Sequence, residues 1–114
     1  MSTHIWKKPV VFRSSGDESA FFGWLSAIPS VASIGGVGTE LHISFRRRSL
    51  PSACLRELLA VYKRYGGDLR ELAYFARASN AKWFCNPQAW WFKSVFPQGA
   101  PNYSLKRTNQ SLRD

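Results

Sequence analysis

The sequence predicts a small α+β fold, in which an antiparallel sheet of about three strands packs one face against three to four helices, in the order β-α-β-β-α-α-α. Two patterns lead to this prediction: apolar residues recur with a period of about 3.6 in several segments, and with a period of about 2 in one segment after a glycine cluster. The chain has 114 residues, of which 45% are hydrophobic, so it has room for one core. We therefore expect a single compact domain over residues 1–99 and a disordered basic tail over residues 100–114.

The N-terminal part of the chain predicts a strand followed by a helix. An apolar run over residues 8–14 is typical of a strand. Ser15 and Glu18 then form a capping-box pattern, and Pro29 marks the end of a helix that we expect over residues 17–28. Its apolar face is predicted from the spacing of Phe21, Trp24, Leu25 and Ile28.

A β-hairpin is predicted next. Leu41, Ile43 and Phe45 alternate with polar residues, which indicates a strand with one buried face. The glycines at positions 35, 36 and 38 precede this strand and give the backbone the freedom that a turn or bulge needs.

The second half of the chain predicts three helices. Helical spacing of leucines and tyrosines indicates the first over residues 49–65, and Gly66 and Gly67 end it because glycine tolerates a left-handed backbone. Asp68 is expected to cap the second helix. A loop and a short helix over residues 87–94 should follow. The second helix is expected to bury Leu69, Leu72, Ala73 and Ala76.

The outward face of the hairpin carries the only catalytic candidate. Glu40, His42 and Ser44 would be neighbours there, and they supply the carboxylate, imidazole and hydroxyl of Ser/His/acid chemistry. Any solvated strand face alternates polar residues in this way, and the sequence shows neither a tight nucleophile turn nor an oxyanion hole. We therefore expect no enzyme activity.

Metals, cofactors and membranes are not expected either. His4, His42, Cys54 and Cys85 lack the spacing of a zinc site, and His4 is expected in a mobile chain end. The two cysteines lie in different predicted elements with no secretory segment before them, which favours a reducing cytoplasm. The longest apolar run is interrupted by Lys93, and none approaches the roughly 20 residues that span a bilayer.

Basic residues give the chain a formal net charge of +9, from 16 Lys and Arg against 7 Asp and Glu. Arg46, Arg47 and Arg48 leave the end of the predicted hairpin, and Lys63 and Arg64 lie near the end of the next helix. Their donors suit a phosphate or an acidic partner, so nucleic acid is a candidate ligand. The plainer interpretation of the three arginines is a solvated connection that protects a sheet edge.

Aromatic residues are concentrated near the C-terminus, at Trp83, Trp90 and Trp91. Adjacent positions on a helix are about 100° apart, so Trp90 and Trp91 cannot both face a core. We expect one of them at the surface, where tryptophan is a favoured anchor for a partner protein or for a second copy of the chain. The alternative is a ring that lies flat over the second face of the sheet.

The C-terminal segment "APNYSLKRT", residues 100–108, resembles the peptide that is translated when a reading frame runs into the recombination site of an integron gene cassette. Similar endings recur across unrelated cassette proteins. The resemblance implies that the DNA element, and not selection on the protein, shaped this tail.

The rest of the chain resembles a family of small uncharacterised bacterial proteins, some of which are found in cassettes. The shared pattern comprises Asp17 and Glu18 before "FFGWL", the segment "LRELLAVYKRYGGDLRELAYF" over residues 55–75, and Trp83 before "WWFKSVF" over residues 90–96. The resemblance implies no particular activity. Such proteins end near the final phenylalanine, whereas this chain continues through the cassette-like tail.

Together these observations favour a non-enzymatic binding protein. Its expected partner is another protein, to be bound or neutralised, or a second copy of the chain, held through Trp83, Trp90 and Trp91. The alternative is a nucleic-acid-binding protein that uses Arg46, Arg47, Arg48, Lys63 and Arg64.

Overall fold

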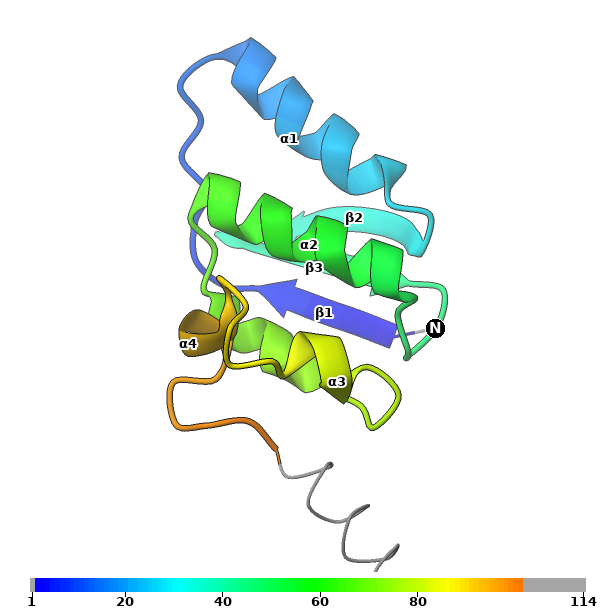
Figure 1. Ribbon diagram of the computed structural model, residues 1–114. Coiled ribbons are helices and arrows are strands. Elements are labelled where there is room, and N and C mark those ends of the chain that lie inside the picture. Colours follow the sequence, from blue (N-terminus) through cyan, green and yellow to red (C-terminus); the bar gives the residue numbers. More distant parts are fainter. Residues whose placement is uncertain (1, 102–114) are drawn as a thin grey trace, which may run out of the picture. The chain divides into compact units, whose positions relative to one another are not determined.

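The computed structural model describes residues 2–101, and Figure 1 shows their helices and strands. They belong to two compact units, Met1–Asp68 and Leu69–Asp114, which we call unit 1 and unit 2. The predicted tail lies outside the described residues, apart from Ala100 and Pro101, and the single domain over residues 1–99 stays a prediction. The elements in chain order are β1 (Ser2–Trp6), α1 (Ser15–Ala27), β2 (Val31–Val37), β3 (Glu40–Phe45), α2 (Ser52–Tyr65), the 3-10 helix η1 (Leu69–Phe75), α3 (Ala81–Phe84) and α4 (Phe92–Val95).

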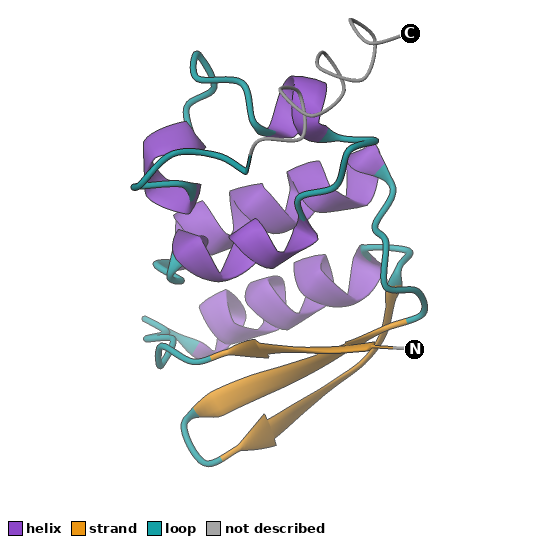
Figure 2. Cartoon of the chain, turned by 90° about the horizontal axis from the view of Figure 1, so that it is seen from below, coloured by secondary structure: helices purple, strands orange, loops and turns teal. Residues whose placement is uncertain are grey.

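Unit 1 contains a three-stranded antiparallel sheet in the order β1-β3-β2, which confirms the predicted α+β class. Its two helices, α1 and α2, lie on one face of the sheet (Figure 2). Strand β3 is central, and its Ile43 and Phe45 are buried, as the alternating pattern predicted. Ile43 is paired with His4 of β1 and with Ile34 of β2, so these three side chains share one face of the sheet.

The first strand is not where the sequence analysis placed it. Residues 8–14 form no strand, and β1 is Ser2–Trp6 instead. The inward side chains of β1 include His4 and Trp6, and both are buried. The run over residues 8–14 contains Pro9, which cannot donate a backbone hydrogen bond, and Val11, which is 82% exposed.

Helix α1 was predicted nearly in full, but its cap is one residue earlier than expected. The backbone N–H of Asp17 donates to the side-chain oxygen of Ser14, at 3.0 Å, so Ser14 and not Ser15 is the N-cap. Phe21 and Leu25 are completely buried, as predicted. Trp24 is half-buried, and its indole N–H donates to Glu57 of α2 at 2.8 Å.

Helix α2 ends at Gly66 as predicted, with a backbone φ of 74° that favours glycine. Its buried Tyr62 stacks on Trp6 of β1, with ring centroids 4.0 Å apart and an interplanar angle of 27°. Gly67 lies against this pair: a Cβ atom there would be 2.5 Å from a ring carbon of Tyr62 and 2.7 Å from one of Trp6. The two rings therefore require glycine at position 67.

His4 is part of this core and not of a mobile chain end. Its Nε2 lies 2.6 Å from the hydroxyl of Tyr62, and the residue is only 8% exposed. Burial lowers the pKa of His4 from 6.5 to about 4, because desolvation disfavours the charged imidazolium. His4 is therefore neutral near pH 7.

Unit 2 has less α-helix than the sequence predicted. The helix expected after Asp68 is the 3-10 helix η1, and its buried residues Leu72 and Phe75 are three positions apart, which matches about three residues per turn. Asn80 is buried, and its side chain accepts from the Arg77 N–H and donates to the Phe75 carbonyl, both at 2.9 Å. These bonds hold the chain where α3 begins.

The two segments after η1 also differ from the prediction. Helix α3, Ala81–Phe84, lies where we expected a loop, and the helix expected over residues 87–94 is limited to α4. The reason lies at Asn86, whose side-chain oxygen accepts the N–H of Gln88 at 2.9 Å. This local bond and the proline at position 87 favour a turn over a helix.

We predict that Gly67→Ala destabilises the protein, because the added methyl group would overlap the Tyr62 and Trp6 rings. Overpacking of this kind costs about 1 to 3 kcal/mol of the free energy of unfolding. The matched control is Gly23→Ala within α1, where nothing lies within 4 Å of a Cβ atom. This control should stabilise the helix by about 0.5 to 1 kcal/mol. Urea denaturation measures both, and equal effects of the two substitutions would contradict the prediction.

A second prediction concerns acid sensitivity. Above pH 6.5 the imidazole of His4 is neutral in the folded and unfolded chains, whereas between pH 6.5 and about 4 only the unfolded chain binds the proton. The free energy of unfolding should therefore fall as the pH falls through this window. From about pH 7.5 to about pH 5, the wild type should lose about 2 kcal/mol more than His4→Gln, which cannot titrate. Equal losses in urea denaturation would show that His4 is not the responsible group.

Candidate functional site

The three candidate partner-binding tryptophans lie in unit 2. Trp91 is 7% exposed, and its indole N–H donates to the Phe84 carbonyl at 2.7 Å. Its ring meets the edges of both Trp83 and Trp90, with centroids 5.8 Å and 5.5 Å away and interplanar angles of 84°. The structure thus brings the three residues together, with Trp91 in the middle.

Trp90 is the exposed member of this group. It is 54% exposed, whereas Trp83 is half-buried, so one of the adjacent pair Trp90 and Trp91 faces outward, as predicted. Within residues 2–101, the indole N–H of Trp90 donates no hydrogen bond. The side chain of Trp90 therefore exposes an apolar ring and an indole N–H donor, and the ring packs against that of Trp91.

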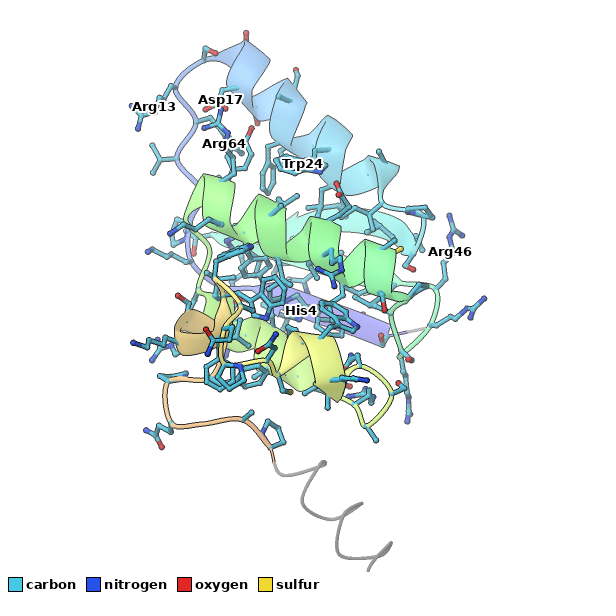
Figure 3. All side chains as sticks on the ribbon, in the orientation of Figure 1. His4, Arg13, Asp17, Trp24, Arg46 and Arg64 are labelled. Atoms are coloured by element: carbon cyan, nitrogen blue, oxygen red, sulfur yellow. The ribbon has the colours of Figure 1, made fainter. Side chains whose placement is uncertain are left out.

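The five residues of the predicted basic surface do not form one cluster. All of them are exposed, but Arg46, Arg47 and Arg48 precede α2, while Lys63 and Arg64 lie in its last turn. A helix of 14 residues is about 20 Å long. Figure 3 shows Arg46 and Arg64 at opposite ends of unit 1. These five residues therefore belong to two separate basic groups.

The strand face with the catalytic candidates forms only part of a triad. His42 Nε2 lies 3.4 Å from Glu40 Oε1 on β3. Ser44 makes no hydrogen bond to His42 within the described part of the chain, although a triad needs its base bonded to the nucleophile. Among the described residues, this face has an acid–imidazole pair but no hydroxyl bonded to the imidazole.

The described residues contain no group of three or more His, Cys, Asp and Glu side chains that could hold a metal ion. Cys54 is buried, and the Ser30 hydroxyl donates to its sulfur at 3.2 Å. Burial raises the pKa of the Cys85 thiol, which keeps it protonated and unreactive near pH 7.

A cleft in unit 1 brings together residues that the sequence analysis did not connect. It has a volume of about 590 Å³ and lies between the loop that follows β1 and the C-terminal end of α2. Figure 3 shows Arg13, Asp17 and Arg64 at this end of the unit. The cleft is lined by Lys8, Pro9, Val11, Arg13, Asp17, Arg64, Tyr65 and Gly66.

Asp17 is the acidic residue of this cleft, and its carboxylate is engaged. Its Oδ2 accepts the backbone N–H of Arg13 at 3.0 Å, and Tyr65 donates a hydrogen bond to it. Desolvation raises the pKa of Tyr65, and the charge of Asp17 and this hydrogen bond add to the effect, while Arg64 opposes it. Asp17 therefore ties the start of α1 to the end of α2.

Only Arg64 of this cleft was among the predicted site residues. Lys8 and Arg13 were missed, because 51 positions separate Arg13 from Arg64 and no local pattern joins them. The signal that could have pointed to Arg13 is the cap of α1. Arg13 directly precedes the N-cap Ser14, and a residue in that position is held in place by the helix that follows it.

The described residues define a small α+β protein with an exposed aromatic group and a basic cleft. No protein-family model, no curated protein and no solved structure matches the chain. Among residues 2–101, no helix has the length and apolar character that crossing a membrane requires.

Proposed function

We propose that this chain is a non-enzymatic binding protein, encoded on an integron gene cassette, that recognises an acidic partner protein through Trp90. The exposure of Trp90 is the observation that carries this proposal. The net charge of +9 favours an acidic partner by electrostatic attraction. The resemblance of residues 100–108 to a cassette end supports the origin; it rests on sequence, since residues 102–114 lie outside the described part.

Trp90 has the properties of an interface anchor. Burial of its exposed surface in a partner would contribute about 2 kcal/mol, from the area of a tryptophan side chain. The ring is held by Trp91, which is itself fixed by its bond to Phe84, so little side-chain freedom remains to be lost on binding. The incomplete triad on β3 supports binding rather than catalysis.

Trp90→Ala should abolish recognition of the partner, with Tyr74→Ala as the matched control. Tyr74 is also in unit 2 and is 60% exposed, so both substitutions remove an exposed aromatic ring. We expect wild type and Tyr74→Ala, immobilised and exposed to a bacterial lysate, to retain the same acidic protein, and Trp90→Ala to retain at least tenfold less. Thermal melting would check that the variants fold.

Two results would contradict this proposal. If Trp90→Ala retains the protein as well as Tyr74→Ala does, then Trp90 is not the anchor. If sedimentation velocity shows a dimer that only Trp90→Ala dissociates, then the partner is a second copy of the chain and not an acidic protein.

A second candidate function is nucleic-acid binding, favoured by the net charge and by the consecutive exposed side chains of Arg46, Arg47 and Arg48. Phosphate contacts by these residues would release counterions, so affinity should fall steeply with salt.

Fluorescence anisotropy with labelled duplex and single-stranded DNA tests this function. Arg47→Gln combined with Arg48→Gln should reduce the slope of log affinity against log salt by about 2, or nearly one unit per lost contact. A chain of residues 1–99 should still bind. Binding that disappears with the tail would mean that the folded part makes no phosphate contacts.

A further inference from the structure

We propose that the cleft between the loop after β1 and the end of α2 binds the phosphate of a nucleotide-sized ligand. Three cations, Lys8, Arg13 and Arg64, converge there from two elements that are far apart in the sequence. This proposal is independent of the Trp90 surface, because every residue that lines the cleft belongs to unit 1.

The cations of the cleft have unused binding capacity. The ammonium of Lys8 and the guanidinium of Arg13 make no ion pair or hydrogen bond within the part of the chain that the structure describes. The Arg64 guanidinium lies over the Tyr65 ring, 5.5 Å from its centroid, and its N–H donors have no acceptor among these residues. All three side chains are exposed and can turn toward a ligand.

The acidic residue in the cleft does not neutralise these cations. Asp17 forms no ion pair with Lys8, Arg13 or Arg64 within residues 2–101, and its carboxylate is bonded instead to the Arg13 backbone and to Tyr65. The same bonds fix one wall of the cleft against the other. Asp17 thus positions the cleft, and it lowers the local positive potential by one charge only.

The balance of charge favours an anion. Three cations face one carboxylate, and the C-terminal end of α2 adds a further negative charge of about one half. The remaining positive charge is large enough to attract a group with more than one negative charge. A phosphate fits this requirement better than a carboxylate, since its oxygens accept the paired donors of arginine.

The other walls of the cleft indicate the size and character of the ligand. Val11 is 82% exposed at the rim, and Pro9 and Tyr65 give further apolar surface. A volume of about 590 Å³ is within the range of small-molecule sites. A phosphate joined to a flat, partly apolar base matches both parts of the cleft, whether the nucleotide is free or belongs to a strand.

Isothermal titration calorimetry of the full-length protein tests the proposal with three probes: AMP, adenosine and a single-stranded oligothymidylate of 12 nucleotides. We expect AMP or the oligonucleotide to bind, and adenosine, which lacks the phosphate, to bind at least tenfold more weakly. Binding of AMP would identify a free nucleotide as the source of the phosphate. Binding of the oligonucleotide alone would identify a strand.

Substitutions then assign the binding to the cleft. Arg13→Gln and Arg64→Gln should each lower the affinity for the probe that binds about tenfold, as expected for the loss of one charge-assisted hydrogen bond. The matched control is Lys82→Gln, an exposed lysine of α3 that belongs neither to the cleft nor to the candidate nucleic-acid surface, which should leave affinity unchanged. Lys8→Gln should also lower this affinity, which tests the loop side of the cleft a second time.

Three results would overturn the proposal. The first is that neither AMP nor the oligonucleotide binds. The second is that adenosine binds as tightly as AMP. The third is that Lys82→Gln weakens binding as much as Arg13→Gln and Arg64→Gln do, since that would indicate a diffuse charge effect and not a site.

Discussion

The stack of Trp6 on Tyr62 is the contact on which unit 1 depends. It joins β1 to α2 with ring centroids 4.0 Å apart, and Phe21 of α1 adds an edge contact to Trp6 at 5.3 Å. The indole N–H of Trp6 is buried without a hydrogen-bond partner among the described residues, at a cost of about 1 to 3 kcal/mol. The aromatic packing offsets this cost, and Gly67 makes the close approach of the rings possible.

The same stack determines where the basic cleft lies. The loop that forms one wall begins directly after Trp6, and Tyr65 and Gly66 of the other wall follow Tyr62 within about one helical turn. Asp17 then fixes the far end of the loop, because it accepts the Arg13 N–H and the Tyr65 hydroxyl. The cleft is therefore a consequence of core packing at one end and of a helix cap at the other.

The sequence predicted the elements whose apolar pattern is unambiguous, namely α1, the hairpin and α2. It did not predict β1, because three of its five residues are Ser2, Thr3 and His4 and the strand is recognised only by the burial of its inward side. The prediction that one of Trp90 and Trp91 lies at the surface was right, although both residues lie in a turn before α4 and not in the predicted helix. The cleft could not be predicted, since its two walls meet through tertiary contacts that no local pattern shows, namely the packing of Trp6 on Tyr62 and the bonds of Asp17.

The two candidate sites are chemically different, and each is built within one unit. The aromatic group uses only residues of unit 2 and offers an apolar ring, whereas the cleft uses only residues of unit 1 and offers charge. Each site can therefore be tested by its own substitutions, because Trp90→Ala removes a ring of unit 2 and Arg13→Gln removes a cation of unit 1.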